Sequence, residues 1–314
     1  LEEIRSHKYT NDSELRILKE IKQGSNFVTL KQFDKKSILL LLESILDVER
    51  SDPREFDRPP ARKSLICNLF YEPSTRTSSS FIAAAKYLGH DVLSINNVQF
   101  SSVSKGETLE DTIRTLASYT HCIVLRHPEV GSASRAAKIS NVPIINAGDG
   151  AGEHPTQTLL DLYTIYKHFG RLDNLVITLM GDLKYGRTVH SLIDVLQMFN
   201  SRIHLVSPPE LRLPDTFNNG HLKSETHIIL TPEVLANTDV LYITRVQTER
   251  GAVGNYQFTA QNAVLLNTKA IVMHPLPRKD ELSVDFDNDP RAKYFEQMSN
   301  GLVVRKYLLG KILG

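Results

Sequence analysis

The stretch Ser74-Thr-Arg-Thr77 stands where an apolar segment gives way to a helical pattern. Pro73 disfavours helix at the residue before it and Ser74 is a good N-cap, so we predict a helix from about Thr75. The free N–H groups and the positive dipole end of a helix N-terminus attract an anion. Three hydroxyls and one guanidinium in that place suit the oxygens of a phosphate, although an ordinary Ser/Thr-rich cap would have the same composition.

Further arginines follow predicted strands. Arg126 ends an apolar segment, Arg187 opens a helical pattern, and Arg245 and Arg250 follow a later strand. Ligands of parallel α/β sheets bind beyond the carboxyl ends of strands, so these guanidinium groups are placed to bind phosphate or carboxylates. Arg126 has a simpler alternative, because it could cap the next helix or pair with Glu129.

Lys105 and His154 also stand in segments that could carry chemistry. Lys105 lies in a polar loop over 97–107, which could bring its ammonium onto an anion or could simply be solvated. Pro155 suits the first turn of a helix, which makes His154 the N-cap and turns Gln157 toward the same side. We expect this His to stay neutral, because the helix dipole disfavours imidazolium, and to donate a hydrogen bond to a carbonyl; a structural His is the alternative.

The segment His274-Pro-Leu-Pro-Arg278 ends a strand in a rigid turn, which leaves the carbonyls of Leu276 and Pro277 as free acceptors. The chain lacks the Cys/His spacing of a zinc site, a carboxylate cluster suited to Mg²⁺ and a nucleophile elbow. The sequence therefore predicts a site for anionic substrates with no metal, no cofactor and no covalent nucleophile.

Strand-like and helix-like segments alternate along most of the chain, which predicts an α/β protein with two doubly wound parallel-sheet lobes. Helices should join the lobes, and the active site should lie in the cleft between them. Expected strands are 64–70, 91–95, 121–126 and 142–146, then 175–181, 203–207, 227–230, 239–244 and 270–273. Expected helices include 75–88, 108–119, 132–139, 155–168, 187–199 and about 290–311. The expected domains are a lead-in over 1–26, a first domain over 27–153 plus 293–314, and a second over 154–292.

Composition limits the class of protein. The 314 residues are 41% hydrophobic and 23% charged, as in soluble globular proteins of two ordinary domains. The 37 Lys and Arg residues nearly balance the 36 Asp and Glu residues, so charge favours neither nucleic acid nor a membrane, and no apolar run suits a transmembrane helix. Two cysteines in strand-like segments, Cys67 and Cys122, indicate a reducing compartment. We expect a cytoplasmic protein, unless a targeting segment preceded Leu1.

Seven sequence motifs occur across residues 25–314 in the order typical of one enzyme family. In these motifs the chain resembles the aspartate/ornithine carbamoyltransferase family, and within it the aspartate branch. The resemblance implies that the amine of L-aspartate attacks the carbonyl of carbamoyl phosphate and gives N-carbamoyl-L-aspartate and phosphate, an early step of pyrimidine biosynthesis. The motifs are 70–77, 105–109, 126–128, 154–157, 181–192, 244–250 and 274–278.

The resemblance also implies a role for each candidate residue. The phosphate would be held by Ser74, Thr75, Arg76, Thr77 and Arg126. The carbonyl and the tetrahedral oxyanion would be stabilised by Thr77, Arg126 and His154, and the carbamoyl NH₂ would be held by Gln157 and the carbonyls of Leu276 and Pro277. The aspartate carboxylates would be bound by Lys105, Arg187, Arg245 and Gln247, with Glu72 and Arg250 orienting the arginines.

In the family, the loop with Ser101 and Lys105 reaches the site of a neighbouring subunit, which implies a homotrimer with shared active sites. A regulatory subunit or fusion to other pathway enzymes stays open.

Three alternative functions fit the sequence less well. The ornithine branch typically has His-Cys-Leu-Pro and Ser-Met-Gly, whereas here Pro275 replaces the Cys and Ser-Met-Gly is absent. A dinucleotide-binding module would need a G-x-G-x-x-G fingerprint, which the chain lacks. A catalytically silent copy that acts as a scaffold would not need the intact polar motifs.

Overall fold

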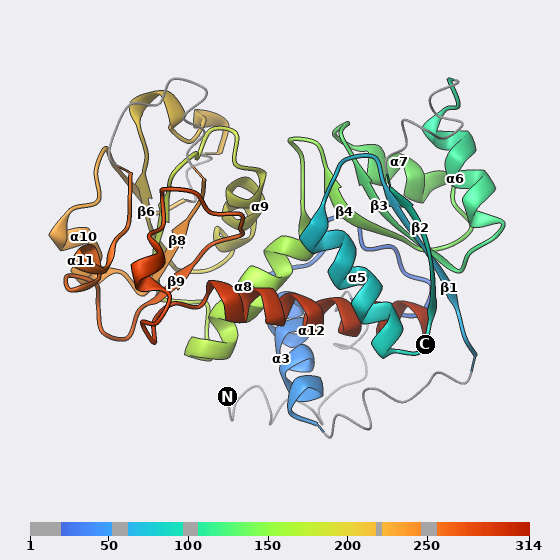
Figure 1. Cartoon of the computed structure of the whole chain (residues 1–314), viewed down its shortest axis with the longest axis horizontal. Coiled ribbons are helices and arrows are strands. Elements are labelled where there is room, and N and C mark those ends of the chain that lie inside the picture. Colours follow the sequence, from blue (N-terminus) through green and yellow to red (C-terminus); the bar gives the residue numbers. More distant parts are fainter. Residues whose placement is uncertain (1–19, 52–61, 97–105, 218–221, 246–255) are drawn as a thin grey trace.

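The computed structural model describes residues 20–51, 62–96, 106–217, 222–245 and 256–314. They form two α/β lobes that lie side by side, each built on an all-parallel sheet (Figure 1). The two-lobe parallel α/β fold predicted from the alternation of strands and helices is confirmed. Within the described residues, no helix combines the length and the apolar character needed to cross a membrane.

The first lobe has a four-stranded sheet in the order β2-β1-β3-β4, with helices on both faces. Alternate residues of β1 explain this layering. Ile66 and Phe70 share a cluster with Phe81 of α5, while Cys67 and Leu69 share another with residues of α6 and α7. The strands are β1 (Leu65–Phe70), β2 (Asp91–Asn96), β3 (Cys122–His127) and β4 (Ile144–Asp149), and the helices are α5 (Thr75–Tyr87), α6 (Leu109–Ala117) and α7 (Ser132–Ile139).

The second lobe has a five-stranded sheet in the order β7-β6-β5-β8-β9, so β7 is an edge strand. The central strand β5 is buried along almost its whole length, as expected where helices cover both faces of a parallel sheet. The strands are β5 (Val176–Met180), β6 (Arg202–Val206), β7 (Ser224–His227), β8 (Val240–Ile243) and β9 (Ile271–Met273), and the helices are α9 (Arg187–Leu196), α10 (Pro232–Asn237) and α11 (Ala260–Ala263).

One strand lies three residues away from its expected place. The apolar run Ile228-Ile-Leu230 suggested a strand over 227–230, but β7 occupies Ser224–His227. Ile228 and Ile229 are 52% and 64% exposed, so they bury no sheet face. The position of β7 is set by its pairing with β6, in which Ile203 lies opposite Ser224, and an edge strand tolerates the polar side chains found there.

Three long helices cross where the lobes meet: α3 (Lys35–Arg50), α8 (Pro155–Phe169) and α12 (Tyr294–Leu313). Helix α8 is buried from its first residue to Tyr166, and α12 packs against both α8 and α5 (Figure 1). Asp34 caps α3 by accepting a hydrogen bond from the Ser37 backbone N–H at 2.7 Å.

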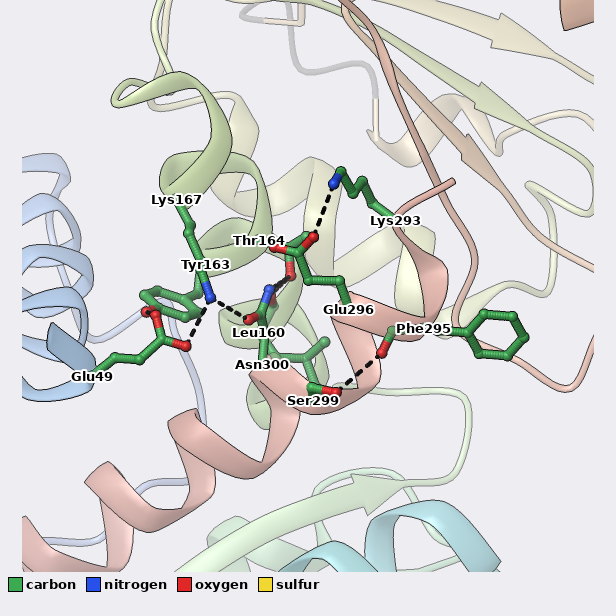
Figure 2. A network of polar contacts seen from close by, with 10 residues as sticks. All are labelled: Glu49, Leu160, Tyr163, Thr164, Lys167, Lys293, Phe295, Glu296, Ser299 and Asn300. Atoms are coloured by element: carbon green, nitrogen blue, oxygen red, sulfur yellow. Dashed lines mark hydrogen bonds and ion pairs between the residues drawn. The ribbon is translucent and has the colours of Figure 1, made fainter. Parts of the chain in front are cut away.

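A polar network joins these three helices (Figure 2). The Lys167 ammonium of α8 donates to Glu49 Oε1 of α3 at 2.7 Å and to Asn300 Oδ1 of α12 at 3.1 Å. Asn300 Nδ2 donates back to Thr164 Oγ1 at 3.0 Å, and the Tyr163 hydroxyl donates to Glu49 Oε2 at 2.7 Å. Because each contact joins a different pair of side chains, the network fixes the three helices relative to one another.

Replacing Asn300 with Ala should lower the free energy of unfolding by about 1–3 kcal/mol, because the substitution removes both hydrogen bonds of this buried amide. Urea unfolding measures the change. Ser299→Ala, one residue earlier and exposed, is the matched control and should stay within about 0.5 kcal/mol of the parent chain. Equal stability of the two variants would show that the network does not stabilise the helix crossing.

Candidate active site

A cavity of about 670 Å³ lies between the two lobes. Its wall is formed by the first turns of α5, α8 and α9, the end of β3, the turn after β9 and one face of α12. Helix N-termini therefore converge on one space, as an anion site requires. The candidate residues that line it are Ser74, Thr75, Arg76, Thr77, Arg126, His154, Gln157, Arg187, Leu276 and Pro277.

The N-cap hydroxyl of α5 is not used to cap its own helix. Ser74 is the N-cap, with extended backbone, but its side chain makes no capping hydrogen bond. In an ordinary Ser cap, the hydroxyl oxygen accepts a hydrogen bond from the backbone N–H of the second or third helical residue. The helix is tied to the sheet elsewhere, because Asn68 Nδ2 of β1 donates to Ser78 Oγ at 2.8 Å. The arrangement favours an anion site over a simple cap.

Arg126 is held beside the cavity by Glu72. Its Nε lies 3.3 Å from Glu72 Oε2, and the residue is only 9% exposed. Burial, and after it the neighbouring Arg187, lower the pKa of Arg126 to about 10, so the guanidinium is still charged at pH 7. The alternative pairing with Glu129 does not occur, since Glu129 pairs with Arg135.

Arg187 of the second lobe also approaches the carboxylate of Glu72. Its Nη1 lies 3.6 Å from Glu72 Oε2 and donates to the carbonyl of Gly150 at 2.8 Å. Gly150 has φ +59°, and a Cβ there would lie 2.0 Å from the Pro128 carbonyl oxygen. Only glycine fits this close approach, so the loop between β4 and α8 presents its carbonyl to Arg187.

His154 is a buried neutral imidazole at the N-terminus of α8. Its pKa lies well below the ordinary value because of burial first and then the nearby Arg187, Arg126 and Arg305. The neutral state agrees with the sequence prediction, but the principal cause is loss of solvent rather than the helix dipole. A neutral ring beside charged guanidiniums can donate one hydrogen bond without adding charge.

Asp161 is a buried carboxylate behind the cavity wall that sequence reasoning did not single out. Its Oδ1 accepts from Gln157 Nε2 at 2.9 Å and from Gln297 Nε2 at 2.6 Å, and its Oδ2 accepts from the Tyr242 hydroxyl at 2.8 Å. Gln297 in turn accepts a hydrogen bond from the His274 backbone N–H at 2.9 Å. Asp161 therefore couples the side chain of Gln157 to the turn that follows β9.

The turn after β9 is fixed by the ring of His274. His274 Nδ1 accepts from the Leu276 N–H at 2.8 Å, so the proton lies on Nε2, which donates to Glu281 Oε1 at 2.9 Å. Leu276 has φ +54°, an unfavourable conformation for a residue with a side chain, which this network maintains. The turn held in this way places Leu276 and Pro277 in the cavity wall.

Arg305 of α12 is a second residue that sequence reasoning missed. It lines the cavity, is 4% exposed, and lies with its guanidinium carbon 5.3 Å from the centre of the Phe81 ring. Burial lowers its pKa to about 10, so the group is charged at pH 7. A charged residue within the apolar pattern of a helix is the sequence feature that marks a buried charge. Arg305 has this feature, and so does Asp161, which lies four residues after Gln157.

Some candidate residues are not brought to the cavity. Arg245 follows β8 and is half-buried, but it does not line the cavity formed by the described residues. Four candidates lie outside the described residues: Ser101, Lys105, Gln247 and Arg250.

Models of two protein domains match this chain. Residues 25–167 match the carbamoyl-phosphate-binding domain of aspartate/ornithine carbamoyltransferases, and residues 173–312 match the aspartate/ornithine-binding domain. The first match ends in the last turn of α8, and the second begins shortly after that helix.

This chain is similar over most of its length to several named proteins. The aspartate carbamoyltransferase catalytic subunit of Thermoplasma volcanium is 44% identical over 90% of this chain and 94% of its own. The multifunctional protein URA2 of Saccharomyces cerevisiae is 45% identical over 93% of this chain, which corresponds to 14% of that protein. The crystal structure of aspartate transcarbamoylase from Trypanosoma cruzi with carbamoyl aspartate and phosphate matches with a TM-score of 0.86 and 40% identity, covering 95% of this chain and 99% of that one.

Asp161→Asn should change how stability depends on pH. Burial raises the pKa of Asp161 to about 7 in the folded protein, against an unfolded value near 3.8. The folded state therefore binds this proton more tightly, so its contribution to stability is complete below about pH 4 and is lost as the pH rises through about 7. Relative to the Asn variant, the parent chain should lose stability over that range.

Urea unfolding at a series of pH values measures this difference. Asp111→Asn, an exposed substitution on α6, is the control and should leave the parent profile unchanged. Parallel profiles for the parent and Asp161→Asn would mean that the buried carboxyl does not titrate as described.

Proposed function

Because this chain belongs to the aspartate/ornithine carbamoyltransferase family, we propose that it transfers the carbamoyl group of carbamoyl phosphate to the amine of L-aspartate. The family expected from the sequence motifs is thereby confirmed. The observation that carries the proposal is the group of guanidiniums from both lobes around one cavity, at which three helix N-termini also meet. A site of this charge suits a phosphate and a dicarboxylate bound together.

The phosphate end of the substrate would bind at the N-terminus of α5. Backbone N–H groups of the first turn and the hydroxyls of Ser74, Thr75 and Thr77 would donate to its oxygens. Arg76 and Arg126 would add charge-assisted hydrogen bonds. Burial lowers the pKa of Arg76, as it does for Arg126, and a bound dianion would restore favourable charge pairing.

The carbonyl of carbamoyl phosphate would lie among Thr77, Arg126 and His154. These groups donate hydrogen bonds to the oxygen on which negative charge develops when the amine attacks. Gln157 and the carbonyls of Leu276 and Pro277 would hold the carbamoyl NH₂. A C–N bond forms, the C–O bond to phosphate breaks, and the phosphate leaves with the proton lost by the amine. The residues mainly orient an activated substrate, so neither a metal nor a cofactor enters the scheme.

Aspartate would be bound by arginines of the second lobe. Arg187 extends from the first turn of α9 into the cavity, and Arg245, Gln247 and Lys105 are proposed as its partners on the two carboxylates. Glu72 would orient Arg187, and Arg250 would support the same group. Ornithine needs one carboxylate site and an acidic partner for its ammonium, so this set of cations favours aspartate.

We further propose a homotrimer in which Ser101 and Lys105 complete the site of a neighbouring subunit. The product would enter pyrimidine biosynthesis. The match to part of a multifunctional yeast protein supports fusion with other enzymes of a pathway as one natural arrangement.

A reducing compartment such as the cytoplasm suits the two free buried cysteines, Cys67 and Cys122. We also propose a first domain of 27–153 plus 293–314 and a second of 154–292, and the packing of α12 on α5 supports the assignment of 293–314 to the first.

Product formation from carbamoyl phosphate with L-aspartate, and in parallel with L-ornithine, tests the proposed reaction. The parent chain should form carbamoyl-aspartate only, in the presence of EDTA. Arg126→Ala should lower kcat by at least about 10²–10³-fold, because it removes an oxyanion donor. Arg114→Ala, on the exposed face of α6, is the matched control and should retain activity. A parent chain inactive with both substrates would instead support the scaffold hypothesis.

Mixing two inactive variants tests the shared sites. Arg76→Ala and Lys105→Ala damage different contributors to the proposed composite site, so hybrid trimers would contain some sites with both contributors intact. Mixed and exchanged subunits should regain part of the parent activity. If subunit exchange is verified by mass spectrometry and activity does not return, the sites are not shared between subunits.

A further inference from the structure

A second cluster of potential ligands lies at the outer edge of the second lobe. His204 of β6 lies opposite Glu225 of β7 in the parallel register, and Val206 lies opposite His227. Since side chains alternate along a strand, Glu225 and His227 emerge on one face of the sheet, beside His204. None of the three lines the cavity between the lobes.

The three side chains converge on one point. His204 Nδ1 lies 3.0 Å from His227 Nε2 and 3.8 Å from Glu225 Oε2, and all three atoms lie within 4.8 Å of one another. Two nitrogens bound to a tetrahedral Zn²⁺ at 2.0–2.1 Å would be about 3.3 Å apart. The imidazoles are therefore already close to the separation that a shared ion requires, and the carboxylate needs only a small rotation to join them.

Burial and access also suit an ion. The His204 side chain is 8% exposed, whereas that of Glu225 is 60% exposed, so the cluster has a fixed inner ligand and an outer one that solvent can reach. Because β7 is the outermost strand of its sheet, no further strand of the described sheet covers the approach. Glu233 of α10 adds a second nearby carboxylate, while Arg202 of β6 opposes it.

We propose that His204, Glu225 and His227 form a binding site for Zn²⁺ or a similar divalent transition-metal ion, which joins β7 to β6. Two imidazoles and one carboxylate are ligands that Zn²⁺ prefers, and a water would complete the tetrahedron. The sequence predicted no metal because these ligands come from two strands and lie 21 and 2 residues apart (204 to 225, and 225 to 227), outside the usual local spacings. The site is independent of the proposed carbamoyl transfer.

The ion would act on the stability of the second lobe. Strand β7 has four residues and pairs on one side only, so it contributes few ladder hydrogen bonds of its own. Metal bonds to Glu225 and His227 would stabilise its position against β6. Since an ion that binds the folded state alone raises stability in proportion to the logarithm of its concentration, the thermal midpoint should rise with added Zn²⁺.

Calorimetric titration of Zn²⁺ into the full chain, stripped with EDTA and dialysed, tests the site. The parent chain should bind close to one equivalent, and Zn²⁺ should raise its thermal midpoint. His227→Gln and Glu225→Gln should each weaken binding by at least roughly 10–100-fold, the loss typical even for residues that only support a metal ligand. Both positions are less buried than His204, which keeps the test independent of a folding defect.

His168→Gln is the matched control, because this histidine is exposed on α8 and away from the cluster. It should bind Zn²⁺ as the parent does. Co²⁺ should give the intense visible absorption of a four-coordinate ion in the parent and in the control, and should lose it in His227→Gln. No saturable binding by the parent, or equal binding by His227→Gln, would overturn the proposal and leave a plain hydrogen bond between the two imidazoles.

Discussion

Positive charge gathered around one cavity, with two of its guanidiniums buried, is the constraint on which the rest of the site depends. Arg76, Arg126, Arg187 and Arg305 come from four different elements and line the same space. Burial lowers the pKa of Arg126 and of Arg305 to about 10, which shows that holding these charges away from water is unfavourable. Glu72 neutralises only part of the positive charge around the cavity, so the guanidiniums still repel one another. A bound polyanion would relieve the remaining repulsion. Burial first, and then the nearby arginines, hold the pKa of His154 well below its ordinary value and keep the ring neutral.

The helix crossing beneath the cavity holds these groups in place. Helix α8 begins at the cavity with His154 and Gln157, and farther along it carries Asp161 and the Lys167 network. Through Asp161 and Gln297 of α12, the amide of Gln157 and the turn at 274–277 are fixed by the same buried carboxylate. Such a scaffold keeps hydrogen-bond donors oriented before substrate arrives, which is the main requirement for electrostatic stabilisation of an oxyanion.

Much of the fold and the site could be predicted from the sequence, because the signals are local. Apolar strands bounded by glycine and proline, and an N-cap such as Ser74, predict most element boundaries to within two or three residues. Asp161 and Arg305 are charged residues within apolar helical patterns, but the sequence could not reveal their roles, because their neighbours lie far along the chain: Asp161 bonds Tyr242 and Gln297, and Arg305 packs on Phe81. The predicted position of β7 was wrong for a similar reason, because the strand is placed by its pairing with β6 rather than by apolar residues nearby in the sequence.

Calorimetric binding of N-(phosphonacetyl)-L-aspartate, which joins a phosphonate to aspartate, tests most directly whether one cavity holds both substrates. If the first lobe binds the phosphate and the second lobe binds the dicarboxylate, the joined ligand should bind once per chain. It should bind roughly 10²–10⁴-fold more tightly than phosphate alone, because the second contact becomes intramolecular. Affinity no greater than that of phosphate would contradict a shared cavity and would separate the two anion sites.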